Sequence, residues 1–207
     1  MSPLFRRRPS AEEVRLANEL DARGFFRYLD PEDAEKAKTA VAKDGIEAIW
    51  RVETARFVLA ADPEDLAEGG IADWLEELRP ALDRMGVRIS EDVEQEIDES
   101  RYVVYTGGRD YAIYDLAGAD AAAAEDRAFL WGLSWSRGFA LLNDLLEQAG
   151  SEERAYAGSD AGVWFLTPEL YEALVAELGS DRERPYVPNE QPPAFGEPSQ
   201  GRGSALP

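Results

Sequence analysis

The chain has 207 residues, of which 42 are acidic and 22 basic, so its formal net charge is −20. It contains no histidine and no cysteine, which excludes Ser-His-Asp catalysis, thiol catalysis, disulfides and thiolate metal sites. A negative surplus this large also opposes binding to nucleic acid and to anionic membranes. We therefore expect carboxylates, tyrosines, arginines and tryptophans to carry the function.

The beginning of the chain is basic, whereas the residues that follow are acidic. The first ten residues include three arginines, and no apolar run follows them. We therefore predict a flexible basic N-terminus over residues 1–10, no export signal and a cytoplasmic location. The composition fits one acidic domain over residues 11–180, and no apolar run reaches the roughly 18 residues that a membrane span needs.

Capping patterns predict the helices of the N-terminal half. Ser10 precedes a helix that runs to about residue 20, and the pairs Asp30-Pro31 and Asp62-Pro63 each place a cap before a proline that suits the first helical turn. Residues 56–60 predict a strand. Apolar residues between positions 71 and 85 share one helical face, and Pro80 is expected to kink or divide that helix.

A hairpin is predicted over residues 101–115 because Gly107-Gly108 suits a two-residue turn with positive φ. Both faces of this ribbon carry apolar residues, so we expect cover on both sides. The predicted register opposes three pairs, namely Thr106 to Arg109, Val104 to Tyr111 and Tyr102 to Ile113.

The C-terminal half predicts a long apolar helix over residues 121–149, strands at 154–156 and 163–166, and a last helix over 167–179. From residue 181 to residue 207 the chain is rich in proline and poor in large apolar residues, which predicts a disordered tail. The predicted fold class is therefore α+β. It is a single compact domain with antiparallel hairpins packed against a long central helix and a disordered C-terminal tail.

The strongest local concentration of charge lies just before the hairpin. Six of the nine residues from 91 to 99 are acidic, and Ile89, Val93 and Ile97 recur every four positions, which predicts a short helix that turns its acids to solvent. This segment is either a solvated face or a docking surface for a basic partner, with tyrosines of the hairpin as anchors. The predicted partner-binding residues are Asp92, Glu94, Glu96, Asp98, Glu99, Tyr102, Tyr105 and Tyr114.

These patterns favour a binding protein over an enzyme. The hypothesis is an acidic cytoplasmic inhibitor of the immunity type, which occludes a basic protein such as a toxin inside its bacterial producer, with no cofactor, no metal and no catalysis. Two alternatives remain open: a carboxylate-dependent enzyme, either glycosidase-like or a transferase, and a non-catalytic scaffold or assembly subunit. The sequence does not define the identity of the partner or the oligomeric state.

Overall fold

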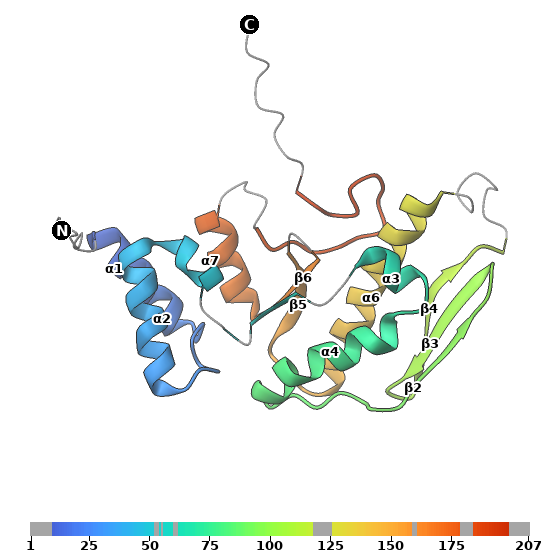
Figure 1. Ribbon diagram of the computed structural model, residues 1–207, viewed down its shortest axis with the longest axis horizontal. Coiled ribbons are helices and arrows are strands. Elements are labelled where there is room, and N and C mark those ends of the chain that lie inside the picture. Colours follow the sequence, from blue (N-terminus) through green and yellow to red (C-terminus); the bar gives the residue numbers. More distant parts are fainter. Residues whose placement is uncertain are drawn as a thin grey trace, which may run out of the picture.

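The computed structural model describes residues 10–51, 54, 56–59, 62–117, 126–158, 161–178 and 184–198. A long helix, α6 (Arg127–Gln148), lies between two antiparallel three-stranded sheets and contacts both (Figure 1). The α+β class and the central helix are therefore confirmed. The other elements, in chain order, are α1 (Ala11–Ala22), α2 (Pro31–Asp44), the 3-10 helix η1 (Ile46–Arg51), β1 (Phe57–Leu59), α3 (Pro63–Ala67), α4 (Ile71–Arg84), β2 (Val93–Ile97), β3 (Arg101–Thr106), β4 (Arg109–Asp115), β5 (Arg154–Ala157), β6 (Gly162–Leu166) and α7 (Pro168–Leu178).

Side-chain caps fix the starts of two helices. The Asp62 carboxylate accepts the backbone N–H of Glu64 at 2.9 Å at the start of α3, and Asp126 accepts the N–H of Phe129 at 3.2 Å at the start of α6. The predicted beginning of the long helix, residues 121–125, lies outside the described residues. Helix α4 is not divided, because Pro80 stands on its exposed side within one continuous helix.

The sheet β1-β6-β5 separates two hydrophobic cores. Alternate residues of β6 point to opposite faces, so Val163 and Phe165 pack toward α4 and α6, whereas Trp164 and Leu166 pack toward α1, α2 and α7. Every residue of β6 is buried. A short strand that is apolar throughout is what a sheet covered on both faces requires.

One buried arginine joins the segments around this sheet. The Arg56 side chain is fully buried, and its guanidinium donates to the Gly24, Phe25 and Phe165 carbonyls and to the Glu153 carboxylate, over 2.8–2.9 Å. The Tyr28 hydroxyl donates to the other oxygen of Glu153 at 2.7 Å. These partners offset the cost of burying the Arg56 charge. Removing the Glu153 carboxylate would leave that charge uncompensated and would destabilise the fold.

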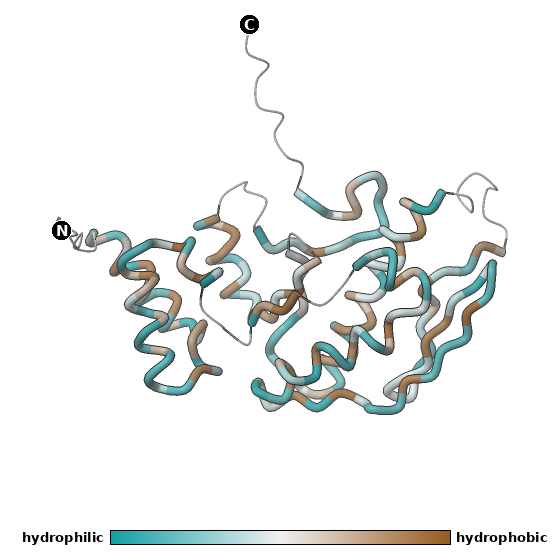
Figure 2. The backbone as a smooth tube through the Cα atoms, viewed as in Figure 1, coloured by the Kyte–Doolittle hydropathy of each residue, from teal (hydrophilic) through white to brown (hydrophobic). Residues whose placement is uncertain are grey.

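The second sheet has the order β2-β3-β4 and contains the predicted hairpin. Two of the predicted pairs are confirmed, but Tyr102 lies opposite Tyr114 because a β-bulge shifts the register beyond Val103. Figure 2 shows the alternation of hydrophilic and hydrophobic residues along these strands. The inner face packs on α4 and α6. The outer face is covered only in part, because Val103 is buried whereas Ala112 is exposed, so the expected cover is complete on one side only.

The acidic segment forms a strand, which corrects the predicted short helix. Residues 93–97 are β2, and they pair antiparallel with β3 from Tyr102 to Thr106. A spacing of four residues is also a multiple of two, so Val93 and Ile97 lie on one face of a strand as readily as on one face of a helix. Pairing with the hairpin decides between the two structures.

Part of the predicted tail is packed on the domain. Residues 184–198 are described, and Tyr186 forms a β-bridge with Ala157 through backbone hydrogen bonds of 2.8 and 2.9 Å. The Tyr186 hydroxyl accepts a hydrogen bond from Trp135 Nε1 at 3.2 Å. The prediction of disorder from residue 181 onward is therefore wrong for residues 184–198, and residues 1–9, 181–183 and 199–207 lie outside the described residues.

Two further contacts explain why composition misjudged this segment. Phe195 is buried against Gly132 and Phe129 of α6, and Arg137 forms an ion pair with Glu190 over 2.8 and 3.0 Å. The prediction used the average apolar content of the tail. A few well-placed side chains hold a short segment that its average composition would leave unfolded.

Candidate docking face on the outer sheet

The outer face of the β2-β3-β4 sheet carries acids around an aromatic side chain. Glu94 lies opposite Tyr105, and Tyr105 lies opposite Asp110, so these three side chains form one row across the sheet. Glu96 follows on the same face, opposite Val103. The acids are exposed and Tyr105 is half-buried, so the row presents carboxylates on both sides of one aromatic group.

Tyr105 is held in place by its neighbour on β2. Its hydroxyl donates to Oε2 of Glu96 at 3.0 Å, and this hydrogen bond raises the pKa of Tyr105. The ring is therefore oriented before any partner arrives. A preoriented aromatic side chain loses little conformational freedom on binding, which suits an anchor residue.

The same row borders a shallow hollow of about 410 Å³ at the turn end of the hairpin. Gly107 and Gly108, with φ of 59° and 74°, make the tight turn that forms one wall. The hollow is lined by Ser90, Asp92, Glu94, Tyr105, Thr106, Gly107, Gly108, Arg109 and Asp110. Three of the predicted partner-binding residues, Asp92, Glu94 and Tyr105, are thus brought together.

The arginine that lines this hollow is already neutralised. Nη1 of Arg109 lies 2.5 and 2.7 Å from the two carboxylate oxygens of Asp144 on α6. The Asp144 carboxylate also accepts hydrogen bonds from Tyr111 and Gln148, and these bonds together with Arg109 lower its pKa. Arg109 therefore forms its ion pair with Asp144 and not with the acids of the hollow.

Two predicted anchors lie in the core instead. Tyr102 is fully buried and Tyr114 is nearly so, with their ring centroids 5.8 Å apart. The Tyr102 hydroxyl donates to Oε1 of Gln95 and accepts the N–H of Ile71 at 3.3 Å, and burial raises the pKa of Tyr102. Both assignments as partner-binding residues are wrong, because Tyr102 lies on the inner face and the bulge brings Tyr114 onto that face as well.

Two predicted acids lie in the turn between β2 and β3. The Asp98 carboxylate accepts hydrogen bonds from the Ser100 N–H, the Ser100 hydroxyl and the Arg101 N–H at 2.7–2.9 Å, and these bonds lower the pKa of Asp98. Its partners make Asp98 a turn-stabilising residue. Glu99 is exposed beside it. Neither residue lines the hollow.

Sequence reasoning missed Asp110, although a signal was present. The Gly107-Gly108 turn fixes the hairpin register, and that register places Asp110 directly opposite Tyr105. Applying the pairing rule to the outer face, and not only to the inner one, would have found Asp110.

Comparisons with protein-family models, with curated proteins and with solved structures found no match to this chain. Within the described residues, none of the helices combines the length and the apolarity needed to cross a bilayer. Among the same residues, no group of three or more potential ligands is arranged to hold a metal ion. The geometry of the outer sheet therefore remains the main guide to function.

Proposed function

We propose that this chain is a binding protein that docks the acidic outer face of its β2-β3-β4 sheet on a basic surface of a partner protein. The specific form that we favour is an inhibitor of the immunity type, which covers the basic working surface of a toxin. The observation that carries the proposal is the row formed by Glu94, Tyr105 and Asp110, which combines exposed charge with an oriented aromatic ring.

In this proposal, charge increases the rate of association and apolar contact supplies the affinity. A concentrated negative field accelerates the encounter with a basic partner by roughly 10–10³. Aromatic side chains at the centre of an interface then supply much of the affinity. The Tyr105 ring has acids on both sides, so an arginine or lysine of the partner can reach a carboxylate while its aliphatic part packs on the ring.

The test compares two variants that lose the same charge from different places. The face variant carries Asp92→Asn, Glu94→Gln and Glu96→Gln. The control variant carries Glu12→Gln, Glu47→Gln and Glu172→Gln, which lie on α1, η1 and α7, on the other side of the sheet β1-β6-β5 (Figure 1).

A partner recovered from source-cell extract by the wild-type chain is used to measure association rates at low and moderate ionic strength. The face variant should associate about tenfold more slowly at low salt and show a flatter salt dependence. The control variant should stay close to wild type. Equal rates for the face variant and wild type would show that this face does not dock the partner.

A further inference from the structure

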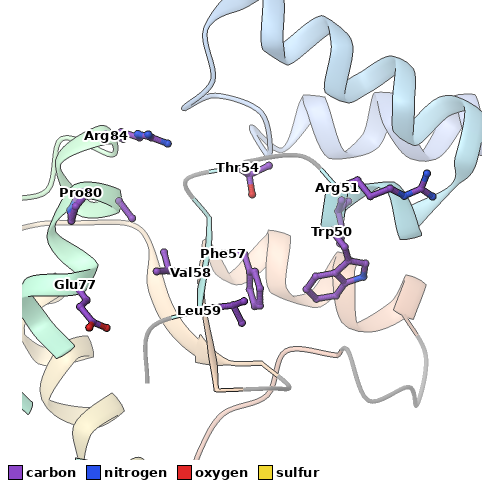
Figure 3. A pocket seen from close by; sticks show the side chains of 11 residues that line it. Trp50, Arg51, Thr54, Phe57, Val58, Leu59, Glu77, Pro80 and Arg84 are labelled. Atoms are coloured by element: carbon purple, nitrogen blue, oxygen red, sulfur yellow. The ribbon is translucent and has the colours of Figure 1, made fainter. Parts of the chain in front are cut away.

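A slot of about 490 Å³ lies between β1 and α4 (Figure 3), and none of its lining residues belongs to β2, β3 or β4. Much of its lining is apolar. Pro80 and Ala81 of α4 line one side, Trp50 lines the other side, and the side chains of β1 lie between these two sides. Leu59 of β1 is 68% exposed, the largest value for any bulky apolar side chain among the described residues. Exposed apolar groups around a hollow are typical of a surface that another molecule covers.

The backbone of β1 has an unpaired edge. β1 is the outer strand of the order β1-β6-β5, with Val58 opposite Val163. The C=O of Arg56 accepts from β6, so in an antiparallel ladder Val58 also bonds to β6. The N–H and C=O groups of Phe57 and Leu59 therefore point the other way, and no described residue pairs with them. An exposed edge of this kind is a template for another strand.

The lining of the slot has more basic than acidic residues, whereas the molecule as a whole is acidic. Arg84 at the end of α4 extends toward Thr54 (Figure 3), and it has no ion pair among the described residues. Arg51 also lines the slot, although it shares its charge with Asp44 at 3.3 Å. Glu77 is the one acid in the described lining. An acidic ligand therefore fits this slot better than a basic one.

We propose that the slot binds an extended peptide segment of a partner protein, which adds a strand to the edge of β1 and presents acidic side chains to Arg84. Alternate side chains of an added strand point to opposite walls. Val58 points toward α4, whereas Phe57 and Leu59 point toward Trp50 (Figure 3). The ligand accordingly places acids on the α4 side and apolar residues on the Trp50 side. This proposal does not depend on the acidic face.

The test uses a synthetic probe, acetyl-Val-Glu-Val-Glu-Val-amide, titrated into the full chain by calorimetry. Two further peptides carry N-methyl groups, one on the first, third and fifth residues and the other on the second and fourth. Only one alternate set of N–H groups can face β1, so one methylated peptide should lose binding by at least about tenfold and the other should keep it. The amide hydrogens of Phe57 and Leu59 should exchange more slowly in the complex.

Charge is tested with Arg84→Glu and with Arg88→Glu, a matched control just beyond α4 that does not line the slot. Arg84→Glu should weaken binding of the glutamate peptide by about fivefold and strengthen binding of its lysine counterpart, whereas Arg88→Glu should change neither. The triple neutralisation on the acidic face should leave peptide binding intact. No binding of the glutamate peptide, equal loss with both methylated peptides, or unchanged exchange at β1 would each overturn the proposal.

Discussion

Replacing Gly132 with alanine tests how residues 184–198 are held against α6. A Cβ atom at Gly132 would lie 2.1 Å from Cδ2 and Cε2 of the Phe195 ring, so the ring must leave its place. Burial of a phenylalanine side chain contributes about 2 kcal/mol, and alanine gains about 1 kcal/mol of helix propensity over glycine. Gly132→Ala should therefore destabilise the wild type by about 1 kcal/mol, and should stabilise a Phe195→Ala chain by about the same amount.

The assay is urea unfolding of the four chains of this double-mutant cycle, with coupling of about 2 kcal/mol expected between the two sites. Ala140→Gly is a matched control, because Ala140 is exposed on α6 and should cost about 1 kcal/mol with or without Phe195. If Gly132→Ala stabilises the wild type and the Phe195→Ala chain equally, then Phe195 does not pack against Gly132.

Three further predictions concern the buried groups and the packed segment. Glu153→Ala leaves the Arg56 guanidinium buried without its carboxylate and should cost about 3–5 kcal/mol in urea unfolding; a cost below about 1 kcal/mol would contradict the role of this pair. Burial raises the pKa of Tyr28 and of Tyr186 to about 12, above the ordinary 10. The stability due to these hydroxyls is complete below pH 10 and is lost as the pH rises toward 12. The melting temperature should therefore fall over that range, and a double Tyr→Phe variant that falls just as steeply would exclude these two groups. Truncation after Ser180 should lower the melting temperature by roughly 5 °C or more, and an unchanged value would show that residues 184–198 do not stabilise the domain.

Local signals predicted most of the elements because each depends on nearby residues. Helices α2 and α3 begin at Pro31 and Pro63 as predicted, although only Asp62, and not Asp30, forms a side-chain cap. The apolar run after residue 126 forms α6. The turn at Gly107-Gly108 fixes the hairpin near its tip. Each of these signals acts within a few residues, so the sequence alone expresses it.

The incorrect predictions concern features that depend on contacts between segments far apart in the sequence. The register of the hairpin fails beyond Val103 because a bulge lies there, and the turn at the other end of the hairpin does not specify it. Residues 184–198 are held by Trp135 and Gly132, which lie more than 50 residues earlier in the chain than their partners Tyr186 and Phe195. Composition gives no sign of such partners. The β1 edge and the slot beside it are likewise visible only once α4 and η1 are placed around them.

The acidic segment shows why charge alone could not define the site. The pleat of β2 turns Glu94 and Glu96 to the outer face, whereas Gln95 turns inward and accepts the N–H of Ala72 at 3.3 Å. Asp98 lies beyond the strand and stabilises the turn with three hydrogen bonds. Neutralising every acid from 91 to 99 would therefore weaken the turn and remove the charge of the outer face together. Restricting the substitutions to the outer face separates the two effects, because the hydrogen bonds of the turn are made by Asp98 and not by the outer-face acids.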